Sequence, residues 1–390
     1  MSFDQGREVV IVEAARTPIG RGHPEKGYYK DTHPNELLGK AYTAVIERSG
    51  IDPSEVEDVI TGCVQQIGEQ AFNVGHNAWL QAGLPMETPA TTVDRQCGSA
   101  QQAVNFAAAL IASGVHDVAI GSGVEHMGRV PFSVGFETQG KYGAAFAPEL
   151  MERYQLVPQG LSAEMIADKW EIPRSELDEL AVRSHRLAHQ ATEDGRFERE
   201  TIPFQVNGDT YVTDQGIRPD TSLEKLSELK PAFKEDGKIT AGNSSQISDG
   251  AAAVLLMSAD KARALGLTPR ARIKDQTTVG VDPVIMLTGP IPATQKLLDR
   301  NKMTIADVDL IEINEAFAPV IAAWQREHQP DMNRVNVNGG AMALGHPLGS
   351  TGARLITTLL HELERSDKEV GLVTMCCGGG LGTGTLIERV

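Results

Sequence analysis

The sequence predicts an α/β protein in which a largely parallel sheet is covered by helices. Strand-like apolar segments alternate with helix-like amphipathic segments at both ends of the chain, which is the rhythm of βαβ units. The chain has 390 residues, of which 41% are hydrophobic and 23% charged, so it can bury a large interior in two or three domains.

The first part of the chain carries this alternation clearly. Residues 36–49 have apolar side chains on one side only, which predicts an amphipathic helix. The run 9–12 is apolar throughout, which predicts a buried strand. The full set of elements expected here is a strand at 9–12, helices at 36–49, 73–81 and 101–113, and strands at 56–64 and 118–123.

The middle of the chain has a different character. Residues 129–148 form loops rich in Gly, Pro and Phe, and helical patterns follow at 162–169 and 174–194. A polar section then supplies Arg218 and three lysines that could meet a charged ligand. We therefore expect an insertion laid over a core that resumes at Gly250.

The last part of the chain again alternates strand-like and helix-like segments, and their order resembles that of the first part. The segment that starts at Cys97 and the segment that starts at Gly349 share the order glycine turn, helix, polar loop, strand and glycine turn, which indicates an internal duplication. The elements expected here are strands at 251–257, 271–275, 308–313, 370–375 and 383–388, and helices at 258–266, 294–300, 316–327 and 353–365.

Charge and cysteine content exclude several classes of protein. The formal net charge of −16 disfavours nucleic acid or an anionic membrane as the main partner. Four cysteines without paired spacing do not make a disulfide framework or a zinc site, so we expect reduced thiols and no metal. No signal peptide or membrane span is visible, and we expect a cytoplasmic protein.

Cys97 is the first candidate catalytic residue. It stands just before a small-residue helix, where unpaired N–H groups and the positive end of the helix dipole would lower the pKa of a thiol. The alternative is a buried structural cysteine, because free cysteines are commonly buried.

Three further motifs follow predicted strands or glycine turns. Asn314 follows a strand and could simply cap a helix. His346 is held between Gly345 and Pro347, which favours a fixed base over a structural turn residue. Cys376 ends a strand before three glycines, which suits acid–base chemistry beside an oxyanion hole; a vicinal disulfide with Cys377 or simple packing are the alternatives.

Together these motifs resemble those of the thiolase family over essentially the whole chain. The matching stretches begin at Cys97-Gly98-Ser99, Gly242-Asn243-Ser244, Asn314-Glu315-Ala316, Gly345-His346-Pro347 and Cys376. The resemblance implies a duplicated five-layer α-β-α-β-α core with a loop domain inserted in the first half. It divides the chain into an N-terminal half (1–124 and 250–272), a loop domain for coenzyme A binding and oligomer contacts (125–249) and a C-terminal half (273–390).

The resemblance also implies the chemistry. Cys97 would be the nucleophile, His346 its activating base and Cys376 the acid–base group. Asn314 would hold a water that forms one oxyanion hole with His346, and the backbone N–H groups of Cys97 and Gly378 would form the other. No permanent cofactor and no metal are implied, and coenzyme A is a substrate. A homodimer or homotetramer is expected.

Substrate contacts are carried over in the same way. Ser245 and Phe317 would lie along the pantetheine, and Arg218 near the nucleotide, although an exposed arginine is also an ordinary surface charge. Met286 and Leu287 stand where the family usually has Met-Gly, and with Gln96 and Gln101-Gln102 they resemble the thiolases of actinobacterial sterol degradation. We assign Met286 and Leu287 to the acyl pocket.

These features favour a degradative enzyme. It would cleave 3-ketoacyl-CoA with coenzyme A to acetyl-CoA or propionyl-CoA and a shortened acyl-CoA, in fatty-acid or sterol degradation. A biosynthetic acetoacetyl-CoA thiolase is the alternative, and a catalytically silent lipid- or CoA-binding relative is a third reading.

Overall fold

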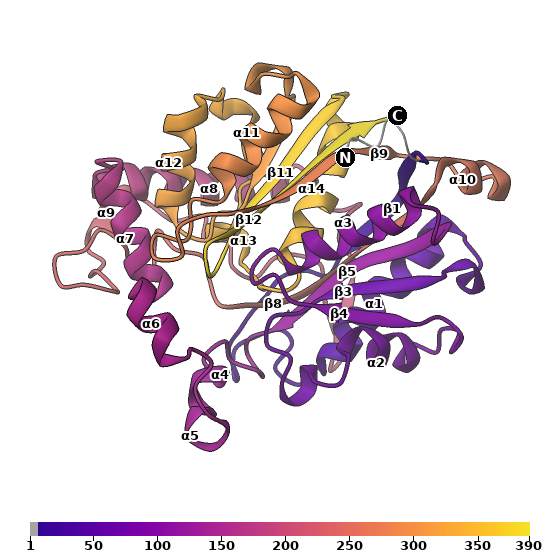
Figure 1. Ribbon diagram of the computed structural model, residues 1–390, viewed down its shortest axis with the longest axis horizontal. Coiled ribbons are helices and arrows are strands. Elements are labelled where there is room, and N and C mark those ends of the chain that lie inside the picture. The colour runs from indigo at the N-terminus through magenta and orange to yellow at the C-terminus, as the bar shows by residue number, and fades with distance from the viewer. Residues whose placement is uncertain (1–6) are drawn as a thin grey trace.

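The computed structural model describes residues 7–390 (Figure 1). Residues 1–6, where no signal peptide is expected, lie outside the described part. Within residues 7–390, no helix has both the length and the apolar character needed to cross a bilayer.

The first half of the molecule is a five-stranded arrangement around long buried strands. Its strands follow the spatial order β4-β3-β5-β8-β1, and the two-residue strand β2 pairs with β8. Their bounds are β1 Val9–Arg16, β2 Gly20–Arg21, β3 Asp58–Gly62, β4 Ala90–Val93, β5 Val118–His126 and β8 Ser248–Ser258.

The second half repeats this order with one strand fewer. It reads β10-β11-β12-β9, and β9 meets β1 of the first half through two residue pairs, Val10 with Arg272 and Ile11 with Ala271. The bounds are β9 Ala271–Gly280, β10 Leu310–Ile313, β11 Val370–Cys377 and β12 Leu381–Arg389.

The expectation of a largely parallel sheet is wrong. β3 is parallel to β4 and β5, and β10 is parallel to β11, but β8, β1, β12 and β9 all pair antiparallel. Strand direction depends on how consecutive strands are connected along the chain. β11 reaches β12 through the tight turn Gly378–Gly380, and such a turn can join antiparallel strands only, whereas a parallel pair needs a long crossover.

The internal duplication is confirmed by the topology. In both halves a helix leads into a strand that lies between a parallel and an antiparallel neighbour. The two similar sequence segments therefore form equivalent elements: α3 (Ser99–Ala112) and β5 in the first half correspond to α14 (Thr351–Ser366) and β11 in the second.

Helices complete five layers (Figure 1). Helices α3 and α14 pack against each other and against the inner faces of both sheets. Helix α1 (Pro34–Ser49) covers the outer face of the first sheet beside α2 (Val74–Gln81), and α11 (Pro290–Asn301) covers the second beside α12 (Ala318–His328). The predicted α-β-α-β-α order is thus observed.

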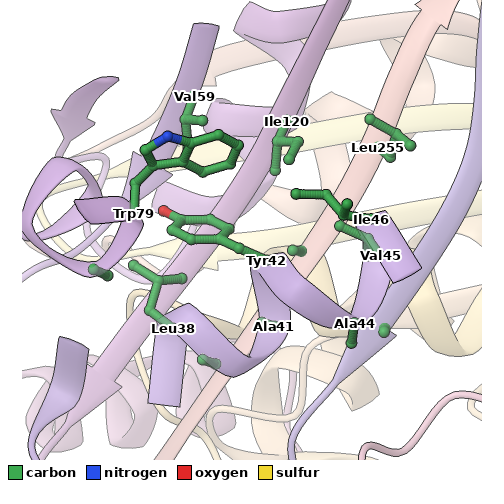
Figure 2. Packing of buried hydrophobic residues seen from close by; sticks show 14 of the residues in the cluster. Leu38, Ala41, Tyr42, Ala44, Val45, Ile46, Val59, Trp79, Ile120 and Leu255 are labelled. Atoms are coloured by element: carbon green, nitrogen blue, oxygen red, sulfur yellow. The ribbon is translucent and has the colours of Figure 1, made fainter. Parts of the chain in front are cut away.

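Buried aromatic residues fix the outer layer of the first half. Figure 2 shows the rings of Tyr42 from α1 and Trp79 from α2 facing each other above the sheet, and their centroids are 5.6 Å apart in an edge-on arrangement. Val59, Ile120 and Leu255 reach the same cluster from β3, β5 and β8. Such packing holds the helix pair to the sheet mainly by removing apolar surface from water.

The segment between β5 and β8 forms a separate group of helices, at the left of Figure 1. Its two longer helices match the prediction closely, because their apolar periodicity was clear. The short elements carried no periodic signal and were missed. The bounds are α4 Val134–Glu137, α5 Gln139–Tyr142, α6 Pro148–Tyr154, α7 Gln159–Lys169, α8 Arg174–Glu193, β6 Phe204–Val206, β7 Asp209–Tyr211 and α9 Leu223–Ser227; α10 (Ala259–Leu265) and α13 (Ala341–Leu344) follow later.

Candidate active site

Cys97 lies in a tight turn between β4 and α3. Gln96 before it adopts a left-handed backbone with φ of 49°. The hydroxyl of Ser99 closes the turn, since it accepts from Arg95 N at 2.9 Å and donates to Gln96 O at 2.6 Å. Gly98 is the N-cap of α3, so Cys97 stands one residue before the cap and not in the first helical turn.

The expectation that the helix start lowers the pKa of Cys97 is wrong. The side chain is only 3% exposed, and burial raises the pKa of its thiol to about 11. The backbone N–H groups of Gly378 and of Cys97 itself act in the opposite direction and are outweighed. These are the two N–H groups expected to form an oxyanion hole, and both face this sulfur. The resting group is therefore a neutral thiol that needs a base.

His346 lies buried in the glycine-rich loop before α14. Its ring Nδ1 is 2.6 Å from Thr351 Oγ1, and its Nε2 is 3.3 Å from Asn314 Nδ2. Its backbone N–H donates to Ser248 Oγ at 3.1 Å. Burial first, and then the charge of Arg354, lower the pKa of His346 to about 3. The imidazole is therefore neutral and can accept a proton.

Asn314 is not a helix cap. Helix α12 begins four residues later, with Phe317 at its N-cap. The backbone N–H of Asn314 donates to Thr374 O at 3.1 Å, which places the residue beside β11, and its side-chain amide faces His346. Its Oδ1 is buried without a hydrogen-bond partner among residues 7–390. An unpaired acceptor of this kind suits a bound water or a substrate donor.

Cys376 and Cys377 end β11 and are buried. Burial, and then the neighbouring thiols Cys97 and Cys377, raise the pKa of Cys376 well above its ordinary value. The Cys377 sulfur packs against Gly98, so closely that a Cβ on Gly98 would lie 2.6 Å from it. All four cysteines are free thiols, and the vicinal disulfide is excluded.

The turn after Cys377 is built from glycines because the backbone requires them. Gly379 and Gly380 have φ of 77° and 82°, which residues with a Cβ rarely adopt. Gly378 has side-chain amides above it, since an added Cβ would lie 2.6 Å from Gln159 Nε2 and 3.4 Å from Gln96 Oε1. The turn thus points the backbone N–H of Gly378 toward Cys97, and the side chains of Gln96 and Gln159 lie over this glycine.

Close glycine contacts hold the segment around His346 against the start of α3 and against β5. A Cβ on Gly352 would lie 2.2 Å from Gln101 N, and one on Gly123 would lie 2.0 Å from Gly349 O. The buried carboxylate of Glu125 also accepts from Gly349 N at 2.8 Å. The segment that carries His346 is therefore fixed both to the helix that follows the thiol and to β5.

Gln101 has a structural role that the sequence did not reveal. We expected Gln101 and Gln102, with Gln96, to report on the acyl group. Instead Gln101 is fully buried and bonds to strands of the other half, donating to Val373 O and Thr385 Oγ1 and accepting from Thr383 Oγ1. Gln102 is also buried. The side chains of Gln101 and Gln102 therefore lie in the interior, and only Gln96 lies beside Gly378 at the candidate site.

The residues expected along the pantetheine lie together. Ser245 N donates to Ala316 O at 2.9 Å, and Ser244 forms a bridge with Phe317, so the two loops run side by side. The ring of Phe317 meets Phe233 edge-on, with centroids 6.0 Å apart. Phe233 carried no sequence signal because isolated aromatic residues in a polar segment are common.

Arg218 is exposed at the edge of the inserted segment. Its backbone N–H donates to Nδ1 of His185 at 3.1 Å, which fixes the chain at this point. Burial and the charge of Arg218 lower the pKa of His185 to about 4. Met286 and Leu287 are instead buried in the same hydrophobic cluster as Cys376.

Three residues around the site were missed in the sequence. Thr351 bonds to the His346 ring, Ser248 to its backbone, and Gln159 lies over Gly378. Thr351 had a weak signal, because it lies only five residues after the histidine. The other two come from distant segments. In the described part of the chain, no group of three or more His, Cys, Asp or Glu side chains is arranged to hold a metal ion.

Two equivalent halves that bring thiols, an imidazole and an amide to their junction meet the needs of a thiol-dependent acyltransferase. Comparison with known proteins gives the family. Residues 9–260 match the model described as Thiolase, N-terminal domain, and residues 267–389 match Thiolase, C-terminal domain. The chain belongs to the thiolase family.

Individual relatives agree with this assignment. The chain is 45% identical over 389 residues to steroid 3-ketoacyl-CoA thiolase FadA6 of Mycobacterium tuberculosis, with 98% of this chain and 94% of that protein covered. It is 45% identical over 397 residues to a 3-ketoacyl-CoA thiolase of Aeromonas hydrophila, with 98% and 100% covered. The crystal structure of the Bacillus anthracis acetyl-CoA acetyltransferase matches with a TM-score of 0.90 and 39% identity, covering 99% of both chains.

Proposed function

We propose that this protein cleaves 3-ketoacyl-CoA with coenzyme A, giving acetyl-CoA or propionyl-CoA and a shortened acyl-CoA. The observation that carries the proposal is a buried neutral thiol, Cys97, and a buried neutral imidazole, His346, on segments that the close contact of Gly352 with Gln101 holds together. Burial raises the pKa of Cys97 and lowers that of His346, so the base can take the thiol proton as the sulfur attacks. Coenzyme A enters as substrate, and no bound cofactor is needed.

In the first half of the reaction, Cys97 would attack the 3-keto carbon while its proton moves to His346 Nε2. The bond between C2 and C3 then breaks, leaving an acyl group on the sulfur and an acetyl-CoA enolate. Cys376 gives its proton to C2 of this enolate. The N–H groups of Cys97 and Gly378 face the sulfur and would stabilise the oxyanion on the former keto oxygen.

In the second half, the Cys376 thiolate would remove the proton of the incoming coenzyme A thiol. The new thiolate attacks the acyl-enzyme, and the Cys97 sulfur leaves as the acyl-CoA forms. His346 returns its proton to Cys97. The acyl-enzyme and the acyl-CoA product are both thioesters of similar energy. The acyl exchange is therefore close to equilibrium, and the site can also catalyse condensation.

A degradative role is supported by the names of the relatives. Proteins of 45% identity are called steroid 3-ketoacyl-CoA thiolase and 3-ketoacyl-CoA thiolase. The solved neighbour called acetyl-CoA acetyltransferase is 39% identical, so a biosynthetic acetoacetyl-CoA thiolase has weaker support. We place the reaction in fatty-acid or sterol degradation.

Substrate binding follows from the same layout. We propose that 125–249 acts as the coenzyme A-binding loop domain, with 1–124 and 250–272 as one thiolase half and 273–390 as the other. Ser245 and Phe317 would contact the pantetheine, Arg218 the nucleotide, and Met286 and Leu287 the acyl pocket. A cytoplasmic location accords with this metabolism.

The proposed oligomer is a homodimer that can associate further to a homotetramer. In residues 7–390, β4 pairs on one side only, with β3. Asn73 bonds to Ala90 and Thr92 of this edge strand, and its neighbour Phe72 is 94% exposed. A free edge beside an exposed aromatic ring suits pairing with a second copy. Light scattering should show a dimer or tetramer, and Thr92→Pro on β4, where the register with β3 turns the backbone N–H toward the free edge, should give a monomer.

The deciding experiment is a substrate panel. CoA-dependent cleavage is measured with acetoacetyl-CoA, longer 3-ketoacyl-CoAs and sterol 3-ketoacyl-CoAs. We expect higher kcat/KM for the longer or bulkier substrates; equal values would remove the support for a degradative role. Cys97→Ser should abolish turnover while coenzyme A still binds. Retained cleavage by that variant would contradict the proposed mechanism.

A further inference from the structure

The hydroxyl of Thr351 has only one proton, and the structure shows where it points. Thr351 Oγ1 lies 2.8 Å from Pro347 O, the carbonyl one helical turn earlier. A carbonyl oxygen accepts and never donates, so the hydroxyl donates to it. The N–H groups of Ser350 and Thr351 approach the same carbonyl at 3.0 Å, which keeps it fixed over the start of α14.

The proton of His346 follows from this. Its Nδ1 is 2.6 Å from Thr351 Oγ1, whose own proton is already directed at Pro347. The contact is attractive only if Nδ1 carries a proton and donates it. With Nε2 protonated instead, two lone pairs would face each other at 2.6 Å in the buried interior, which is repulsive.

The opposite edge of the ring agrees. In the neutral Nδ1–H tautomer, Nε2 carries a lone pair and accepts. Asn314 Nδ2 lies 3.3 Å away and can donate to it. This fixes the amide of Asn314 with Oδ1 turned elsewhere, and that oxygen is buried without a partner among the described residues. One hydroxyl therefore orients both the imidazole and the amide.

We propose that Thr351 is a positioning residue that holds His346 in the Nδ1–H tautomer and leaves Nε2 unprotonated, so that it can take the proton of Cys97. This inference rests on the proposed function. When the Cys97 proton moves to Nε2, the ring becomes an imidazolium whose Nδ1–H still donates to Thr351. The new Nε2–H is then a donor for the substrate oxygen, so one ring atom serves first as base and then as oxyanion donor.

The tautomer can be observed without any activity assay. Histidine-labelled protein is studied by solid-state ¹⁵N NMR at neutral pH, and the His346 signals are assigned from the spectrum of His346→Asn. We expect a protonated Nδ1 and an unprotonated Nε2 in the native protein. A native ring with Nε2 protonated overturns the proposal, whatever the enzyme's substrate.

Kinetics of three variants give the second readout. Thr351→Val keeps the shape and removes the hydroxyl, and we expect kcat to fall about 10- to 100-fold with KM little changed, a loss like that seen when the hydrogen-bond partner of a metal-bound histidine is removed. Thr351→Ser retains the hydroxyl and should restore kcat to within a few-fold. In Thr351→Val the NMR signals should show a mixture of tautomers.

Thr357→Val is the matched control. Thr357 is also buried on α14 and also donates to a carbonyl one turn earlier, Ala353 O at 2.8 Å, but does not bond to His346. It should leave kcat unchanged. Equal loss in Thr357→Val and Thr351→Val, or native kcat in a folded Thr351→Val, overturns the proposal. Loss of cleavage in the native protein on every substrate would instead refute the proposed function and leave the tautomer result standing.

Discussion

Gln101 and Thr385 join the two halves of the molecule through a buried hydrogen bond of 2.8 Å, from Nε2 to Oγ1. The same amide donates to Val373 O at 3.1 Å and accepts from Thr383 Oγ1 at 2.6 Å. Gln101 lies one helical turn after Cys97, and Thr383 pairs with Met375 beside Cys376. One side chain therefore ties the helix that follows Cys97 to β11, which carries Cys376, and to β12 beside it.

Replacing Gln101 by Met should test this. The change keeps the length of the side chain but takes away the acceptor of the buried Thr383 hydroxyl and the donor to Val373 O and Thr385 Oγ1, and a buried group left unpaired costs about 1–3 kcal/mol. We expect a loss of about 2–4 kcal/mol in the free energy of unfolding and a fall in kcat larger than any change in KM. Urea unfolding and steady-state kinetics measure both. Gln295→Met, at an exposed glutamine of α11, is the control, and equal stability of the two variants would contradict this role.

The elements with a clear period were predictable from the sequence. The helix predicted at 174–194 is Arg174–Glu193, and the one predicted at 353–365 lies within Thr351–Ser366. The direction of the strands was not predictable, because it depends on where β8 and β12 join the sheets. The short helices between residues 134 and 154 have too few residues to show a period.

The candidate site was predictable only as residue types. Cys97, Asn314, His346 and Cys376 each stand in a motif with chemical meaning, and the structure brings Asn314 to His346 as expected. Effects that depend on how deeply a side chain is buried were not predictable. Burial reverses the expected pKa shift of Cys97, and nothing in the sequence separates a buried Gln101 from one that meets substrate.

Adjacent cysteines at the end of β11 should respond very differently to substitution. Cys376→Ala removes the proposed acid–base group, and we expect kcat to fall about 10²–10⁴-fold. Cys377→Ala removes a sulfur that packs against Gly98 and should keep kcat within about tenfold at a modest cost in stability. Both variants are compared by cleavage rate and by thermal unfolding. Similar losses of kcat in the two variants would show that the roles of the thiols are misassigned.

Arg218 should matter for coenzyme A and not for its pantetheine part. The side chain is exposed, so a contact with a nucleotide phosphate is worth about 0.2–1 kcal/mol, or a rise of about 1.4- to 5-fold in KM for coenzyme A in Arg218→Ala. The rise should shrink as salt is added, because exposed charges are screened.

The matching assay uses pantetheine as the acyl acceptor, for which Arg218→Ala should equal the native protein. Arg263→Ala is the control, since Arg263 is an exposed arginine on α10 that pairs with Asp260. If KM for pantetheine rises as much as KM for coenzyme A, Arg218 does not contact the nucleotide.

His361 on α14 should make the protein less stable in acid. Its Nδ1 donates to Thr357 O at 2.8 Å, and its Nε2 is buried without a partner among residues 7–390. Burial, and then the charge of Arg270, lower the pKa of His361 to about 3; Arg199 acts in the same direction, Glu364 in the opposite one. The unfolded chain has an ordinary histidine pKa of about 6.5.

The sign follows from proton binding. Between pH 6.5 and 3 the unfolded chain holds a proton on this residue that the folded protein does not, so falling pH favours unfolding by about 1.4 kcal/mol per pH unit. Above pH 6.5 the contribution is constant. His361→Gln cannot bind this proton, so its stability relative to the native protein should rise by about that slope as pH falls from about 6 to 4. Urea unfolding across this range measures the difference, with the surface variant His23→Gln as control. A difference that stays flat with pH would mean that His361 titrates alike in the folded and unfolded chain.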